Sequence, residues 1–137
     1  RIGPTAALAT LKVMEDIKSW EIITEIGGKM REGWIKLAES YNLKINISGL
    51  PSLSTYSFES KNALKYKTFI AQEMLKKGYL ASTNFYASTA HNIENLAFYF
   101  EALESVYSVI SDCEKDNLKI DNLLNGPVCH SGFKRLN

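Results

Sequence analysis

Residues 4–41 carry the pattern of two helices. Residues 6–17 are rich in Ala, Leu, Met, Lys and Glu, which favour helices, and Pro4 suits a first helical turn. The next stretch keeps one apolar face through steps of three and four residues, at Ile23, Ile26, Met30, Trp34, Leu37 and Tyr41. Gly27 and Gly28 lie inside this face without interrupting it, which indicates close packing rather than a break.

The middle of the chain alternates between apolar and polar residues. Residues 44–48 and 53–58 each follow the two-residue period of a half-buried strand, and residues 49–52 form a turn between them. We expect these two strands to pair antiparallel. Residues 62–77 return to a helical pattern and end in two lysines followed by Gly78, which is a typical helix C-terminal signal.

The remaining residues predict short extended pieces and one further helix. Residues 80–82 and 85–87 can form short strands, and Asn92 is expected to cap a helix. The apolar positions of that helix again step by three and four, at Ile93, Leu96, Phe100, Leu103, Tyr107 and Ile110. Residues 118–124 allow a short helix or strand before a C-terminal tail.

The order of these elements predicts the fold class. The chain reads as helix, helix, strand, strand, helix, short strands and helix. We therefore expect an α+β fold, with a small antiparallel sheet, helices packed on one face of it, and a long N-terminal helix preceding both.

Length and charge exclude several classes of partner. The chain has 137 residues, which suggests one domain that hides roughly two-thirds of its extended surface. Its net charge is +1, so no global electrostatic field attracts nucleic acid or an anionic membrane. It also lacks an apolar run of the roughly 18 residues that a membrane-spanning helix needs. We expect neither nucleic acid nor a membrane as a partner.

The cysteines and histidines offer little chemistry. Cys113 and Cys129 are interpreted as reduced thiols of a cytoplasmic protein, because a disulfide-stapled secreted domain carries more cysteines. Neither has the spacing of a zinc site. A thiol enzyme that pairs Cys113 or Cys129 with His91 stays an alternative. The expected role of His91 is a hydrogen bond to the backbone at a strand–helix junction.

By residues alone, the sequence holds no complete active site. It has no glycine-rich phosphate-binding motif, and its aromatic residues between Tyr79 and Phe100 are expected in the core rather than on a base-stacking surface. Arg135 is a candidate for holding a substrate carboxylate, since a guanidinium binds that group with two parallel hydrogen bonds.

Four stretches carry a resemblance to a known family. They are Gly3-Pro4 with the alanine-rich residues 6–11, then residues 28–38, 72–80 and 88–91. In this order they resemble the C-terminal small domain of class III pyridoxal-phosphate (PLP) aminotransferases, and most closely the glutamate-1-semialdehyde aminomutase branch. The resemblance covers almost the whole chain. It implies that residues 1–137 are a single C-terminal small domain of a longer chain, and the absence of an initiator Met agrees with that expectation.

The resemblance implies a cofactor and partners for the parent enzyme. Such an enzyme holds PLP on a lysine as a Schiff base and works as a cytoplasmic homodimer. The implied partners are a large PLP-binding domain of the same chain, a second subunit, and a small amino or carbonyl substrate. The motif around the Schiff-base lysine is absent from this sequence. We therefore assign no catalytic, cofactor-binding or metal residue, and expect the chain alone to bind no PLP and to be inactive.

The resemblance also implies a substrate-binding segment. It places the distal end of the substrate against Thr83, Asn84 and Phe85, with Arg135 reaching the substrate only if the tail folds back. Thr83 replaces a glutamate expected in the aminomutase branch, and no arginine lies between Gly78 and His91. The substrate, and the choice between aminotransferase and aminomutase, stay open. An alternative of another class is a free-standing α+β interaction or dimerisation domain without catalysis.

Overall fold

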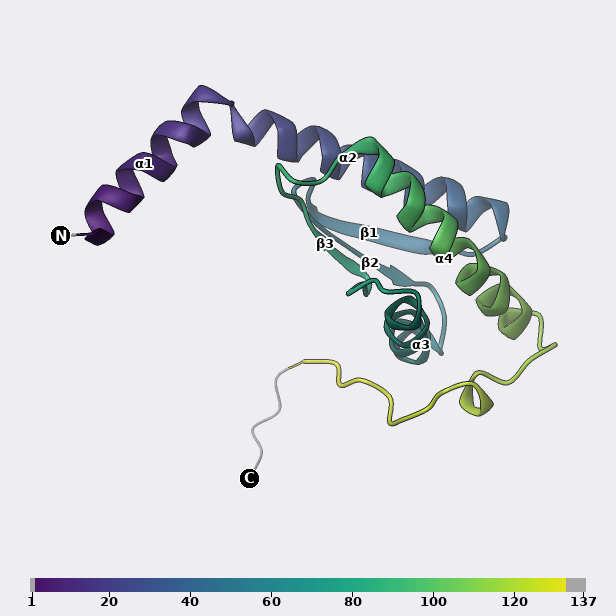
Figure 1. Cartoon of the computed structure of the whole chain (residues 1–137). Helices are drawn as coiled ribbons and strands as arrows, with labels where there is room; N and C mark the ends of the chain where they lie inside the picture. The colour runs from purple at the N-terminus through teal and green to yellow at the C-terminus, as the bar shows by residue number, and fades with distance from the viewer. Residues whose placement is uncertain (1, 133–137) are drawn as a thin grey trace.

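The computed structural model describes residues 2–132, and its elements follow the predicted order (Figure 1). The elements are α1 (Ile2–Asp16), α2 (Ser19–Ser40), β1 (Ile45–Leu50), β2 (Leu53–Phe58), α3 (Ala63–Lys76), β3 (Asn84–Tyr86), α4 (Ile93–Glu114) and a short 3-10 helix η1 (Ile120–Asn122). The α+β fold class predicted from the sequence is confirmed, with a small antiparallel sheet and a long helix at the N-terminus.

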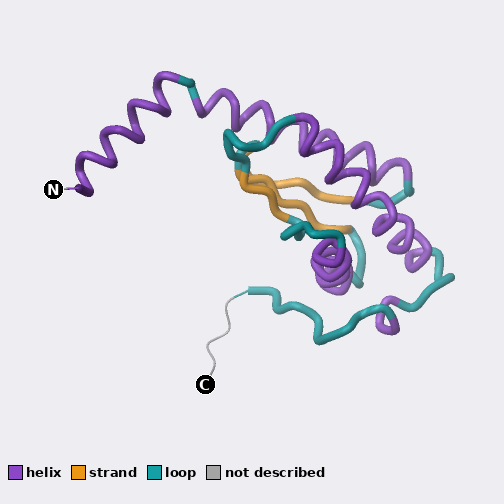
Figure 2. The backbone as a smooth tube through the Cα atoms, in the orientation of Figure 1, coloured by secondary structure: helices purple, strands orange, loops and turns teal. Residues whose placement is uncertain are grey.

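Strand β2 is the centre of a three-stranded antiparallel sheet (Figure 2). Tyr56 faces Ile47 of β1, and Ser54 faces Phe85 of β3. The predicted pairing of the first two strands is therefore confirmed.

The prediction of a strand at residues 80–82 is wrong. The backbone N–H of Tyr56 donates to the carbonyl of Thr83 over 2.9 Å, so contact with β2 begins only there.

One face of the sheet carries the core. Tyr56 and Phe58 alternate onto this face, where the Tyr56 ring lies 4.6 Å from the ring of Trp34 in α2. The Phe58 ring lies 5.5 Å from Tyr66 in α3 and 5.6 Å from Tyr107 in α4. Helices α2, α3 and α4 thus pack on the same face, as the sequence predicted. Burying five large rings together supplies both apolar area and favourable tilted and edge-to-face contacts.

The opposite face of the sheet is polar apart from one exposed apolar row. Leu50 pairs with Leu53, and Leu53 pairs with Tyr86, so the three side chains form a row across all three strands. Their exposed fractions are 66%, 50% and 67%. We call these residues the sheet-face row.

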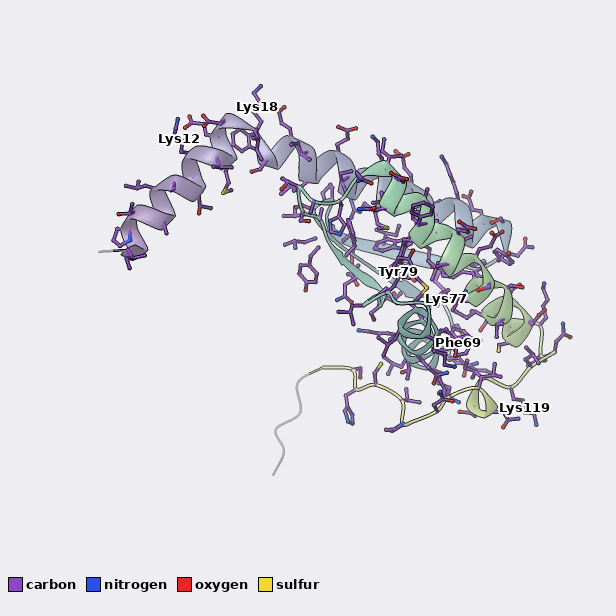
Figure 3. All side chains as sticks on the ribbon, viewed as in Figure 1. Lys12, Lys18, Phe69, Lys77, Tyr79 and Lys119 are labelled. Carbon is purple, nitrogen blue, oxygen red and sulfur yellow. The ribbon has the colours of Figure 1, made fainter. Side chains whose placement is uncertain are left out.

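Helix α1 extends away from the rest of the protein (Figure 1). All of residues 2–16 are exposed, including Leu8 and Leu11. The chain bends between α1 and α2 at Lys18, whose φ of 49° is left-handed and ends the first helix. Figure 3 shows Lys18 pointing outward at this bend. The predicted helix is therefore confirmed, but its apolar side chains contact no core in the described residues.

Several predicted helix ends are confirmed. Gly78 has a φ of 87° and follows the last turn of α3, where its N–H donates to the carbonyl of Leu75. Asn92 caps α4, since its Oδ1 accepts the N–H of Asn95 over 2.8 Å. The C-terminal tail then runs back along α3, where the N–H of Cys129 donates to Thr68 Oγ1.

Gly27 allows the backbone of α2 to lie directly on the turn between β1 and β2. A Cβ at Gly27 would overlap the carbonyl group of Pro51, whereas a Cβ at Gly28 would meet no atom within 4 Å. The sequence interpretation of close packing is therefore confirmed for Gly27 and wrong for Gly28. The neighbouring glycine costs helix stability without a packing gain.

These two glycines provide a matched test of that packing. We expect Gly27→Ala to lower the free energy of unfolding by about 2 kcal/mol, because α2 must move away from the Pro51 backbone. Gly28→Ala should raise it by about 1 kcal/mol, since alanine is the better helix former and has room there. Urea unfolding followed by circular dichroism measures both. Equal effects of the two substitutions would contradict the packing of α2 on the turn.

Candidate functional site

A cleft of about 320 Å³ lies where α2, the segment after α3 and the first half of α4 meet. Its lining residues are Met30, Trp34, Tyr79, Leu80, Ala81, Asn84, Phe85, His91, Asn95, Leu96 and Tyr99. We call this space the α2–α4 cleft. Residues 79–91 supply more than half of that set, so the polar, aromatic segment after Gly78 forms a wall of it. In Figure 3 the labelled Tyr79 marks the start of this wall, next to the end of α3.

The structure brings two of the four predicted substrate-binding residues into the cleft. Asn84 and Phe85 both line it. Thr83 is buried outside it, and its carbonyl accepts the N–H of Tyr56 and, over 3.0 Å, the hydroxyl of Thr55. Arg135 lies outside the described residues. The role of all four in binding a substrate stays a prediction.

His91 has the backbone contact that the sequence predicted. Its Nδ1 lies 3.0 Å from both the N–H and the hydroxyl oxygen of Ser88, and its ring centroid lies 4.8 Å from that of Phe85. Because a backbone N–H can only donate, Nδ1 is the acceptor in this pair. The neutral ring therefore carries its hydrogen on Nε2, which leaves a donor on a residue that lines the cleft.

The floor of the cleft comes from helices that sequence reasoning assigned to the core. Met30 and Trp34 of α2 are almost fully buried, and the Trp34 Nε1–H donates to the hydroxyl of Tyr99 over 3.1 Å. Burial raises the pKa of Tyr99 to about 12, and the hydrogen bond from Trp34 offsets part of that rise. The phenol is therefore neutral at physiological pH.

Sequence reasoning missed Trp34, Asn95 and Tyr99 as cleft residues. Trp34 belongs to an apolar helical face, so its periodicity predicts burial and carries no signal for a ligand. Asn95 and Tyr99 lie four residues apart on α4, and this spacing places them on the same side of the helix. This spacing of a polar and an aromatic residue was the one feature of the sequence that could have indicated a cleft on this side of α4.

The cysteines do not form a thiol site. Cys113 is buried, and burial raises the pKa of its thiol, with a smaller effect from the carboxylates of Asp112 and Glu114. Cys129 donates its Sγ–H to the carbonyl of Leu64. Within residues 2–132, no hydrogen bond joins either thiol to a histidine. This arrangement is the reverse of an activated nucleophile, whose pKa is lowered by a neighbouring cation.

Metal and membrane sites find no support in the described part of the chain. No group of three or more His, Cys, Asp or Glu side chains among residues 2–132 is placed to hold a metal ion. None of the helices described has the length and apolar content required to cross a membrane.

The fold is similar to one part of a solved structure, that of the FumI protein of Sphingopyxis sp. MTA144 in its PLP internal aldimine form. The superposition has a TM-score of 0.68, with 21% sequence identity, and covers 80% of this chain. The match spans 27% of the FumI chain, so this chain corresponds to a minor part of that protein's length. At this identity the likeness establishes the fold. No protein-family model matches the sequence, and no curated protein matches it.

The α2–α4 cleft does not fit PLP. The cofactor needs an amine for its Schiff base and cations or backbone N–H groups for its phosphate. The described lining contains no lysine and no arginine. The first turn of α4 does not replace them, because the Asn95 N–H is already bonded to Asn92 and Glu94 adds a negative charge. The cleft can hold an uncharged group, but its lining within residues 2–132 supplies no residue that would carry the cofactor.

The burial of Cys113 predicts unequal thiol reactivity. In the native protein at neutral pH, we expect iodoacetamide to modify Cys129 first, because Cys113 is buried and its raised pKa keeps the thiol protonated. Mass spectrometry of the digested protein over time measures the two rates, and the same reaction in urea should remove the difference. Faster modification of Cys113 in the native protein would restore the thiol-enzyme alternative.

Proposed function

We propose that this chain is the small domain of a PLP-dependent enzyme of the aminotransferase or aminomutase type, and that its α2–α4 cleft forms part of the substrate side of the active site. The observation that carries the proposal is the likeness of its fold, over 80% of the chain, to part of a protein solved as a PLP internal aldimine. The proposal includes the class III family and its glutamate-1-semialdehyde aminomutase branch, on the strength of the motifs in residues 3–11, 28–38, 72–80 and 88–91.

The proposed division of work follows from the residues present. The lysine that forms the Schiff base and the phosphate contacts belong to a large domain of the same parent chain. This domain contributes position and shape: Asn84 and Phe85 contact the substrate, and Trp34 closes the floor of the cleft. The chain alone is therefore inactive in amino-group transfer.

Two exposed apolar surfaces support a covering partner. Helix α1 has no buried residue, and the sheet-face row crosses all three strands without cover. Contiguous apolar surface of this kind marks interaction sites, and a domain separated from its neighbour exposes such surface as well. We assign α1 and the sheet-face row to contacts with the large domain and with a second subunit of a cytoplasmic homodimer.

A free-standing interaction domain uses the same exposed surfaces and is the second candidate. The coding sequence upstream of Arg1 separates the two. A large α/β domain encoded there supports the enzyme, whereas a start codon or an unrelated domain found there supports the interaction domain.

The cofactor test uses the chain as given. On mixing the purified protein with PLP at neutral pH, we expect no stoichiometric aldimine absorbance, because none of the described residues that line the cleft is a lysine able to form a Schiff base. The FumI protein, whose solved form holds the internal aldimine, is the positive control. A one-to-one aldimine band that a single lysine substitution abolishes would show that this chain itself holds the cofactor, and the proposed division of work would be wrong.

A further inference from the structure

The polar residues that line the α2–α4 cleft in the described part of the chain include no lysine, arginine, aspartate or glutamate. In the described residues their polar groups are the amide of Asn95, the ring of His91, and the hydroxyls of Tyr79 and Tyr99, whereas the side chain of Asn84 lies with that of Tyr86 on the exposed face of the sheet. Within residues 2–132, the side-chain amide of Asn95 forms no hydrogen bond, although this residue lines the cleft. His91 adds its Nε2–H, since its Nδ1 is used by Ser88. These groups provide donors and acceptors for a ligand, and the described lining adds no lysine or arginine to pair with a carboxylate.

The walls between these groups are apolar and aromatic. Trp34, Phe85 and Leu96 come from three different elements of the fold, and Met30 closes the space beneath them. Such walls remove water from a bound group. A charged group that loses its water without gaining a partner of opposite charge pays a large desolvation cost, whereas a neutral group with a carbonyl or hydroxyl oxygen does not.

We propose that the α2–α4 cleft binds the uncharged, largely apolar end of a substrate, through a carbonyl or hydroxyl oxygen held by the Asn95 amide and His91, and discriminates against a carboxylate. The identification of the ligand as a substrate rests on the proposed function. The selectivity itself needs only the cleft, so it can be measured without PLP and without the rest of an enzyme.

A pair of probes of the same shape tests the selectivity. Benzamide and benzoate differ at neutral pH in one group, a neutral amide against a carboxylate. Titration of the 15N-labelled chain should move the indole N–H signal of Trp34, because that group lies in the cleft and donates to Tyr99. We expect affinity for benzamide at least about tenfold above that for benzoate, the ratio that one modest electrostatic penalty produces.

Trp20 is an internal control. It is the other tryptophan of the chain, it is half exposed at the start of α2, and it does not line the cleft. Its indole signal should stay in place, and Trp20→Phe assigns the two signals. Equal affinity for the two probes, or no movement of the Trp34 signal with either one, would overturn the proposal.

A gain of benzoate binding gives a second and independent readout. Asn95→Lys adds a cation to the lining, and Ser105→Lys adds one to the exposed side of the same helix. We expect benzoate affinity to rise at least about tenfold in Asn95→Lys and to stay unchanged in Ser105→Lys. Equal benzoate binding by the two variants would show that the cleft is not where the probe binds. An aldimine formed by the wild-type chain would refute the proposed function and leave this selectivity as measured.

Discussion

The contact between the rings of Trp34 and Tyr56 is the one on which the fold and the cleft both depend. It joins α2 to the central strand, and Phe58 and Tyr107 extend it to α4. The Tyr56 and Tyr107 hydroxyls have no hydrogen bond of ordinary geometry in the described residues, and burial raises the pKa of both. Leaving such groups unpaired costs about 1–3 kcal/mol each, so the surrounding ring contacts must outweigh that cost.

Sequence periodicity was enough to predict the elements wherever one face is buried. Strand β2 was predicted with its observed bounds because its alternate residues, Tyr56 and Phe58, face three helices. The strand predicted at residues 80–82 was wrong, since Leu80 is 97% exposed and the segment makes no ladder pairing with β2. The prediction that Gly28 packs closely was also wrong, because an unbroken apolar pattern does not tell which of two adjacent glycines makes the contact.

The cleft was less predictable than the fold, for a physical reason. Asn84 and Phe85 lie in the short edge strand β3, whose three residues carry too little periodicity to mark a site, so only a resemblance could single them out. Trp34 and Tyr99 are helical residues that serve the core and the cleft at once, and their periodicity reports only the core. Thr83 was predicted to contact a substrate through its side chain. In the structure its carbonyl instead accepts hydrogen bonds from Tyr56 and Thr55 of β2.

The residues of the cleft and the exposed apolar surface both favour a larger protein of which this chain is one part. The cleft lining described by the structure has no lysine or arginine, so these residues can shape and dehydrate a ligand but cannot form a Schiff base or pair with a phosphate. An exposed α1 and an uncovered sheet-face row carry apolar area whose exposure to water is unfavourable. A parent enzyme whose other parts cover this area and carry the Schiff-base lysine and the phosphate contacts would account for both features. That economy favours the proposed large domain over a free-standing interaction domain, which explains the exposed surface but leaves the cleft without a purpose.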